Sequence, residues 1–274
     1  MFWVARFILI RWYSTMTTFP TFRRAILALL PATLLLASCS KDDEPVAPVV
    51  DQGSVLFVNA AASNPVSIKA FVNNEEKATL AYGSATSGYQ AVPTGTPTIK
   101  IDNAASAGTS FFSQTVTVAK DQRYSYFVYS TSTDATVVPA GFLVADDLTA
   151  PAAGKAKIRL VNVAFGYPNP AGAISLSQSQ PIGFLPITSA VNFLGASNFV
   201  EINSGSANLL ITTGTSPTGS TVGAVGDGTG TGTGATGTGT KNYEAGKIYT
   251  IVVRGTAGLP DPARQPKAFI IQNN

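Results

Sequence analysis

The residue types that carry most enzyme chemistry are scarce in this chain. It has no histidine, and Cys39 is its only cysteine. A Ser-His pair, a Cys-His pair and a His/Cys metal cluster are therefore excluded. Carboxylates remain, as the adjacent pairs Asp146-Asp147 and Glu75-Glu76. Adjacent residues on a strand point to opposite faces, so neither pair converges on one substrate atom, and we interpret both as solvated loop charges. We predict a protein that is not an enzyme and uses no metal or cofactor.

The glycine-rich stretch at residues 212–240 spells a dinucleotide fingerprint between Gly232 and Gly237. That fingerprint works only between a strand and a helix, and the sequence that follows has no helical pattern. A phosphate-binding loop is missing its Gly-Lys-Ser/Thr, and Asp227 alone does not make a calcium-binding glycine repeat. The composition predicts a disordered insertion between two strands.

Exposed tyrosines are the remaining candidates for ligand contact. Tyr82, Tyr89 and Tyr167 could contact a glycan or a peptide at the cell surface. Trp3 and Trp12, the two tryptophans, lie in the N-terminal leader, so the mature chain lacks the strongest stacking platform for sugars.

Two further pairs of residues are interpreted as structural. Tyr124 and Tyr249 each follow a tight turn at the head of an apolar strand, as in a tyrosine corner, whose hydroxyl ties down backbone. Asn59 and Asn162 each end a strand, where the side chain bonds local backbone. Ligand contact is the alternative for both pairs.

The first 38 residues have the pattern of a secretory signal. Arginines precede an apolar run at residues 25–36, and the pattern is complete from Met16, which we expect to be the true start of the protein. The run is shorter than the about 20 residues that a membrane-spanning helix needs. Small residues and Cys39 follow it. The apolar run, the small residues and the lone cysteine together predict a cleaved leader at residues 1–38.

The end of this leader, Leu36-Ala37-Ser38-Cys39, resembles the lipobox of bacterial lipoproteins. The resemblance implies cleavage between Ser38 and Cys39 and acylation of Cys39, with the membrane as partner through the lipid. Two or more acyl chains give durable anchoring. The alternative is an ordinary secretory signal with a chance cysteine.

The charged residues after the cysteine resemble the export signal of Bacteroidetes lipoproteins, which implies a location on the outer membrane facing the cell exterior. The alternative is a solvated start to the tether at residues 39–52. The residues concerned are Ser40, Lys41, Asp42, Asp43 and Glu44.

The charge balance gives no support to nucleic-acid binding. The whole chain has a formal charge of +3, but four of its arginines lie in the leader, and without them the balance is −1. A basic chain would favour nucleic acid as a partner; this mature chain is not basic, and we predict no such partner.

Apolar runs separated by Pro and Gly clusters predict an all-β fold. The run at 157–163 echoes 54–60, 246–253 echoes 121–128, and 267–271 echoes 141–144. A repeat of about a hundred residues predicts two tandem immunoglobulin-like β-sandwiches. We place the first sandwich at 53–148, a linker at 149–154 and the second sandwich, with the insertion, at 155–274.

The motifs Phe57-Val58-Asn59-Ala60, Leu80-Ala81-Tyr82-Gly83 and Val92-Pro93-Thr94-Gly95 resemble the family called domain of unknown function 4397. Members occur in secreted and lipoprotein contexts, often in tandem. The resemblance is best over 53–146 and weaker over 155–273. The family's acidic turn after the asparagine is replaced here by Ala62-Ser63-Asn64-Pro65.

These observations lead to one expectation and two alternatives. We expect a non-enzymatic, surface-displayed lipoprotein that acts in adhesion, as a scaffold or as an accessory module. A glycan- or peptide-binding module of outer-membrane nutrient uptake is the second hypothesis. A glycoside hydrolase built from distant carboxylates is the third.

Overall fold

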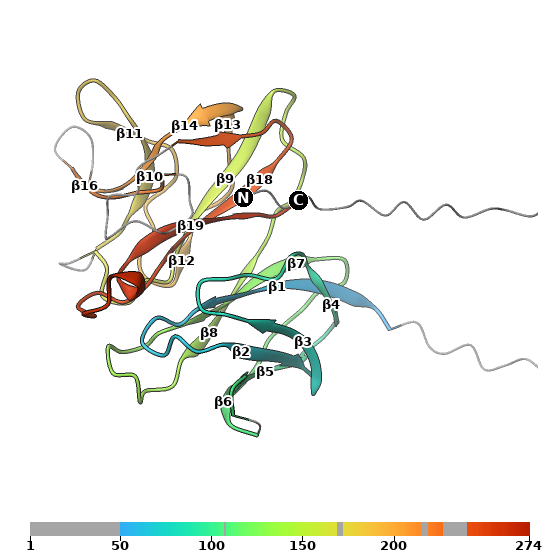
Figure 1. The fold of residues 1–274 in the computed structure, drawn as a ribbon. Helices are drawn as coiled ribbons and strands as arrows, with labels where there is room; N and C mark the ends of the chain where they lie inside the picture. Colours follow the sequence, from blue (N-terminus) through green and yellow to red (C-terminus); the bar gives the residue numbers. More distant parts are fainter. Residues whose placement is uncertain (1–49, 107, 169–171, 215–218, 227–239) are drawn as a thin grey trace, which may run out of the picture. The chain divides into compact units, whose positions relative to one another are not determined.

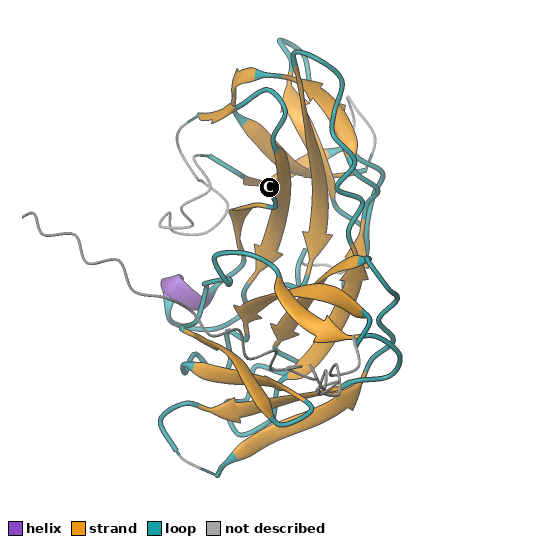
Figure 2. Cartoon of the chain, turned by 90° about the vertical axis from the view of Figure 1, so that its right-hand side faces the viewer, coloured by secondary structure: helices purple, strands orange, loops and turns teal. Residues whose placement is uncertain are grey.

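The computed structural model describes residues 50–106, 108–168, 172–214, 219–226 and 240–274. They belong to one compact unit that begins at Pro48. Figures 1 and 2 show that the regular secondary structure of this unit is almost entirely strand, joined by loops; the one helix in these ranges is the 3-10 turn η1, Pro262–Arg264. The predicted all-β fold of sandwiches is therefore confirmed.

The first sandwich has two four-stranded sheets, ordered β4-β1-β7-β8 and β3-β2-β5-β6. In β2 the alternate residues Ile68, Ala70 and Val72 are buried, and they pack with residues of the opposite sheet such as Phe57. The strands are β1 (Gln52–Ala60), β2 (Ile68–Val72), β3 (Glu75–Leu80), β4 (Gln90–Pro93), β5 (Thr98–Asn103), β6 (Ser110–Thr115), β7 (Arg123–Tyr129) and β8 (Ala140–Ala145).

The second sandwich has sheets ordered β12-β9-β18-β19, with β13 also on β9, and β11-β10-β15-β16; a further pair is β14-β17. Its own core includes Leu160, Leu176 and Ile251. The strands are β9 (Lys155–Asn162), β10 (Ser175–Ser179), β11 (Phe184–Pro186), β12 (Gly195–Ala196), β13 (Val200–Asn203), β14 (Gly205–Ala207), β15 (Leu209–Thr213), β16 (Ser220–Ala224), β17 (Lys241–Tyr243), β18 (Ile248–Arg254) and β19 (Lys267–Gln272).

Both sandwiches use the same strand order. In each, the first strand lies parallel to the strand before last: β1 beside β7, and β9 beside β18. The last strand then pairs antiparallel with that strand, β8 with β7 and β19 with β18. The sequence echoes therefore fall on strands that occupy equivalent places.

A third apolar cluster joins the two sandwiches. Leu56 and Val58 of β1 contribute to it, and so do Val161 of β9 and Phe269 of β19. The neighbouring residues on β1 and β9 point the other way, into the core of their own sandwich. The apolar runs of these strands are continuous because both faces of each strand are buried.

The corner tyrosines have the predicted role. The Tyr124 hydroxyl accepts a hydrogen bond from the Ala119 amide at 3.2 Å, and the Tyr249 hydroxyl accepts one from the Glu244 amide at 3.1 Å. The separation is five residues in both cases. The predicted structural role of both tyrosines is therefore confirmed.

The two strand-ending asparagines also bond local backbone, as predicted. Asn59 Oδ1 accepts from the Ala61 amide, and Asn162 Oδ1 accepts from the Ala164 amide. Asn59 does more than this, because its Nδ2 also donates to the Leu80 carbonyl, 21 residues away.

The glycine-rich insertion differs in part from the prediction. Within residues 212–240, predicted to be disordered, Ser220–Ala224 form strand β16, which pairs with β15 through a bulge. Val225 is buried in the core of the second sandwich. This part of the insertion completes a sheet, because β15 would otherwise leave unpaired backbone at the sheet edge.

Candidate functional site

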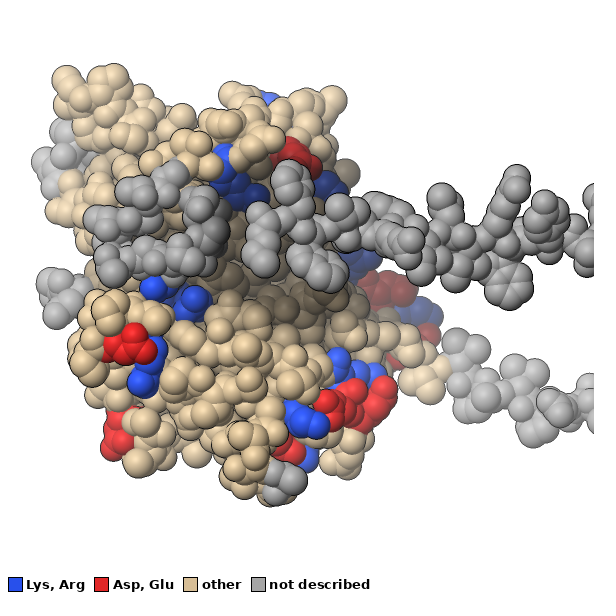
Figure 3. Space-filling model, in the orientation of Figure 1, with Lys and Arg blue, Asp and Glu red and all other residues tan. Residues whose placement is uncertain are grey.

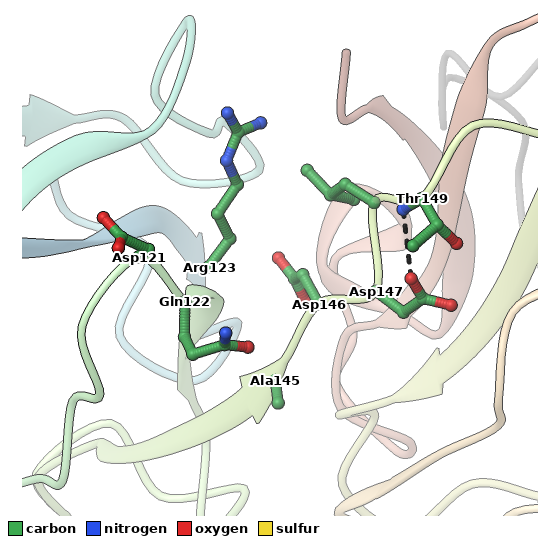
Figure 4. Close-up of a pocket in the computed structure, with 8 residues that line it drawn as sticks. Asp121, Gln122, Arg123, Ala145, Asp146, Asp147 and Thr149 are labelled. Atoms are coloured by element: carbon green, nitrogen blue, oxygen red, sulfur yellow. Dashed lines mark hydrogen bonds between the residues drawn. The ribbon is translucent and has the colours of Figure 1, made fainter.

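An open pocket of about 560 Å³ lies where β8 ends and the linker begins. It brings the predicted pair Asp146-Asp147 close to the start of β7. Figure 4 shows the two sides of the pocket, which is lined by Asp121, Gln122, Arg123, Ala145, Asp146, Asp147, Leu148 and Thr149.

Asp146 is buried, so its interpretation as a solvated loop charge is wrong. Its Oδ1 accepts a hydrogen bond from Arg159 Nη2 at 2.5 Å. Its Oδ2 accepts from the Ser125 hydroxyl at 2.7 Å and from the Tyr89 hydroxyl at 2.5 Å. A carboxylate survives away from water only with such partners, and here both oxygens have them.

Arg159 supplies the opposite charge from the second sandwich. It lies on β9 and is only 1% exposed. Besides Asp146, its Nη1 donates to the Ala145 carbonyl at 3.0 Å and its Nε to the Thr250 hydroxyl at 3.0 Å. Its Cζ atom lies 4.5 Å from the centre of the Phe199 ring. The guanidinium therefore binds both sandwiches.

Hydrogen bonds close this arrangement into a ring. Thr250 donates to Asn273 Oδ1 at 2.8 Å, and Asn273 Nδ2 donates to the Tyr89 hydroxyl at 2.9 Å. Tyr89 in turn donates to Asp146. We call this set the Arg159 network; its members are Arg159, Asp146, Ser125, Tyr89, Asn273 and Thr250.

The sequence contains a signal that could have identified Arg159 as a residue of this site. In the echo of the two sandwiches, Arg159 falls opposite Leu56, which lies in the apolar cluster between the sandwiches. An arginine inside a buried run needs a partner acid, because burying an unpaired charge is costly. The nearest acids before it in the chain are Asp146 and Asp147.

Asp147 is the exposed member of the pair, as predicted. The Thr149 amide donates to it at 3.0 Å and Lys157 Nζ approaches at 3.3 Å. The hydrogen bonds from Thr149 hold the pKa of Asp147 below its ordinary value, so it stays ionised. Both oxygens of Asp146 are hydrogen-bonded, so the exposed carboxylate of this pocket is that of Asp147. The pocket offers a mixed-charge surface for a polar ligand.

The other carboxylate pair lies on a different sheet. Glu75 pairs with Lys77 at 2.8 Å and Glu76 with Lys69 at 3.0 Å. The hydrogen bond from Lys69 lowers the pKa of Glu76. Both glutamates are exposed on β3, in agreement with their interpretation as solvated charges, and β3 belongs to a different sheet from β8, the strand that Asp146 follows.

The three tyrosines proposed as ligand contacts are placed differently from one another. Tyr89 is half-buried and belongs to the Arg159 network. Tyr167 packs on the core of the second sandwich and donates to the Val222 carbonyl at 2.7 Å. Tyr82 lies against Arg254, with 4.6 Å between its ring centre and the arginine Cζ. The structure does not gather them into one binding surface.

The predicted lipidation and export residues, Cys39 with Ser38 and residues 40–44, lie outside the described residues. In the ranges that are described, no helix is long and apolar enough to cross a membrane. Nor does any group of three acidic, histidine or cysteine side chains there come together as a metal site.

A comparison with protein-family models finds the domain of unknown function DUF4397 at residues 53–169. The match covers the first sandwich and continues through the linker and β9. It therefore contains both Asp146 and Arg159. No curated protein matches the chain at a significant level.

Proposed function

We propose that this chain is a non-enzymatic lipoprotein of the cell envelope, whose folded unit acts in adhesion, as a scaffold or as an accessory module. The observation that supports this most directly is the joining of the two sandwiches by an apolar cluster and the Arg159 network. A fully satisfied buried network fixes one relative orientation, which suits a module that presents a surface or transmits force.

The anchor is Cys39, which carries the lipid in this proposal, and the unit is displayed on the outside of the outer membrane. The proposal rests here on the lipobox and on the charges that follow it. The compact unit begins at Pro48, shortly after those charges, so the acylated cysteine and the folded part are separated by a short tether.

Anchoring and display are tested by two variants. Cys39→Ser should move the protein from the membrane fraction to the soluble fraction, since acyl chains provide the attachment. A matched control, Ser40→Ala, should stay in the membrane. Protease added to intact cells should release the wild-type unit. Membrane retention of Cys39→Ser would contradict the anchor, and protection of the wild type until the outer membrane is opened would contradict the display.

The pocket at the end of β8 favours a second candidate, a glycan- or peptide-binding module of nutrient uptake. Its volume of about 560 Å³ and its mixed charges suit a small polar ligand. The soluble form, residues 46–274, keeps the whole compact unit and can be applied to an array of neutral glycans and peptides. Binding lost in Arg123→Ala but kept in Lys120→Ala would support this candidate, and no binding would reject it.

A further inference from the structure

Arg254, the last residue of β18, is a buried arginine that forms no ion pair with an acid among the described residues. It is 7% exposed, and its Nε and Nη1 atoms have no hydrogen-bond partner. Buried charges in proteins are normally paired and hydrogen-bonded, so unpaired donors on a buried guanidinium indicate a missing acceptor.

Aromatic rings and a glycine surround this guanidinium. Its Cζ lies 4.6 Å from the ring centre of Tyr82 and 5.3 Å from that of Phe269. A Cβ added at Gly83, where φ is +80°, would lie 2.8 Å from Nη2. Cation–π contacts offset part of the charge, but they leave Nε and Nη1 without an oxygen acceptor. Tyr82 and Gly83 come from the first sandwich, so the site spans both.

Among the described residues, the charged side chains of Lys267, Arg264 and Asp261 lie around Arg254 and Tyr82. Lys267 lies directly opposite it on β19 and is 9% exposed. Burial and the neighbouring Arg254 lower the pKa of Lys267, while Asp261 acts in the other direction. Arg264 of η1 donates to the carbonyls of Ala62 and Ser63 at 2.6 and 2.7 Å. In Figure 3, Lys and Arg side chains lie on the side of the molecule where η1 lies, with an acidic side chain among them.

The Tyr82 hydroxyl adds one more unpaired donor. It is buried and has no hydrogen-bond partner. Burial raises the pKa of Tyr82, while the neighbouring Arg254 acts in the other direction. We refer to Arg254, Lys267, Arg264 and Tyr82 as the Arg254 cluster. The donors without a partner are Nε and Nη1 of Arg254 and the hydroxyl of Tyr82, and one oxyanion could accept from all of them.

We propose that the Arg254 cluster binds one oxyanion group, a carboxylate, sulfate or phosphate, between the two sandwiches. The planar guanidinium presents paired N–H donors that match two oxygens of such a group, and Lys267 and Tyr82 add charge and a hydroxyl donor. Tyr82 is only partly buried while Arg254 is covered, so entry of the anion moves the tyrosine ring. This site is independent of lipid anchoring.

Titration calorimetry on residues 46–274 tests the proposal, with sodium sulfate, sodium phosphate and sodium glucuronate as probes and glucose as the uncharged control. Ionic strength is held constant with chloride, because sulfate stabilises many proteins through exclusion from their surface. We expect saturable binding at one site per chain. Binding of glucuronate identifies an acidic sugar or another carboxylate as the source; binding of the inorganic ions alone identifies a free anion. No binding of any probe overturns the proposal.

Three variants and a control identify the site. Arg254→Met keeps most of the side-chain volume and should weaken binding roughly tenfold or more, because a charged hydrogen-bond donor is lost. Tyr82→Phe should weaken it less. Asp261→Asn keeps the hydrogen bond to the Ala263 amide that caps η1 and should tighten binding, since it removes a competing charge. Lys120→Gln removes an exposed charge that pairs with Asp51 and should change nothing.

Circular dichroism and the thermal midpoint show whether each variant folds. Arg254→Met that is folded and binds sulfate as the wild type does would overturn the assignment of the site. So would equal weakening of binding in Lys120→Gln and Arg254→Met, because only a general effect of net charge would then remain.

Discussion

The two buried arginines of the second sandwich, Arg159 and Arg254, lie on neighbouring strands and both contact the first sandwich, yet their surroundings are opposite in kind. Arg159 has a carboxylate, two hydroxyls and a carbonyl as acceptors. Arg254 has two aromatic rings and, on two of its nitrogens, no acceptor.

This difference distinguishes the groups that stabilise the interface between the sandwiches from the groups that remain available to a ligand. A buried ion pair whose hydrogen bonds are satisfied specifies one arrangement of the parts around it. A buried charge without a hydrogen-bonded counter-charge raises the free energy of the folded state, and aromatic contacts offset only part of that cost. The first arginine therefore has a structural explanation within the chain, whereas the second requires a partner from outside it.

The largest expected effect comes from removing the acid of the Arg159 network. Asp146→Ala leaves Arg159 buried without its counter-charge and should lower the free energy of unfolding by about 3–5 kcal/mol. Urea denaturation measures it. The control is Asp147→Asn at the exposed neighbour, which should cost less than about 1 kcal/mol. Equal losses in the two variants would contradict the contrast between these adjacent residues.

A double-mutant cycle tests whether Arg159 and Asp146 act as a pair. Arg159→Leu places at this position the residue that the first sandwich has at Leu56, and by itself it should destabilise because Asp146 stays buried and charged. The double variant Arg159→Leu/Asp146→Asn also removes that charge. Its loss of unfolding free energy should be smaller than the sum of the losses in the two single variants, by about 2–3 kcal/mol. Strict additivity of the two free-energy changes would show that the residues do not act as a pair.

Alkaline pH should weaken the Arg159 network by deprotonating Tyr89, at a pH where the guanidinium groups are still protonated. Burial, and then the charge of Asp146, raise the pKa of Tyr89. A raised tyrosine pKa means that its contribution to stability is full below the ordinary value of 10.0 and is lost as the pH rises above it. Tyr89→Phe should lose about 1 kcal/mol at neutral pH and show a smaller further loss above pH 10. Parallel pH profiles for the two proteins would contradict this.

The smallest expected effect is at Arg254. In a chloride buffer free of oxyanions, Arg254→Met should change the free energy of unfolding by less than about 1 kcal/mol, or raise it, because an uncompensated charge is replaced by an apolar side chain. The same measurement on Arg159→Met should show a large loss, because Asp146 is left unpaired. Similar large losses in both variants would show that Arg254 is held by the fold as firmly as Arg159.

The parts of the fold that depend on local pattern could be predicted from the sequence. Runs such as 54–60 and 157–163 predicted buried strands, and the position of Tyr124 and Tyr249 after tight turns predicted their hydrogen bonds to backbone. These features are set by residues close together in the chain. The same runs are apolar at successive positions, which indicates a covered outer face but not what covers it.

The Arg159 network and the Arg254 cluster could not be predicted in the same way. Asn273 and Tyr89, which share a hydrogen bond, are 184 residues apart. Asp146 has an exposed acid as its neighbour, and only the path of the chain after β8 decides that one carboxylate enters the interface and the other does not. The Gly/Thr-rich composition around Ser220–Ala224 favoured disorder, but this segment forms a strand because it pairs with the edge of β15.

The parallel pairing of β1 with β7, and of β9 with β18, affects how the chain folds as well as its final structure. Ser54 pairs with Arg123 and Lys157 pairs with Ile248, so each sandwich needs nearly its whole length before its first strand finds its neighbour. Such high contact order slows folding. The first strand of each sandwich is therefore synthesised long before the strand that pairs with it in parallel. In the second sandwich the parallel strands lie further apart in the chain, and this sandwich also contains both buried arginines.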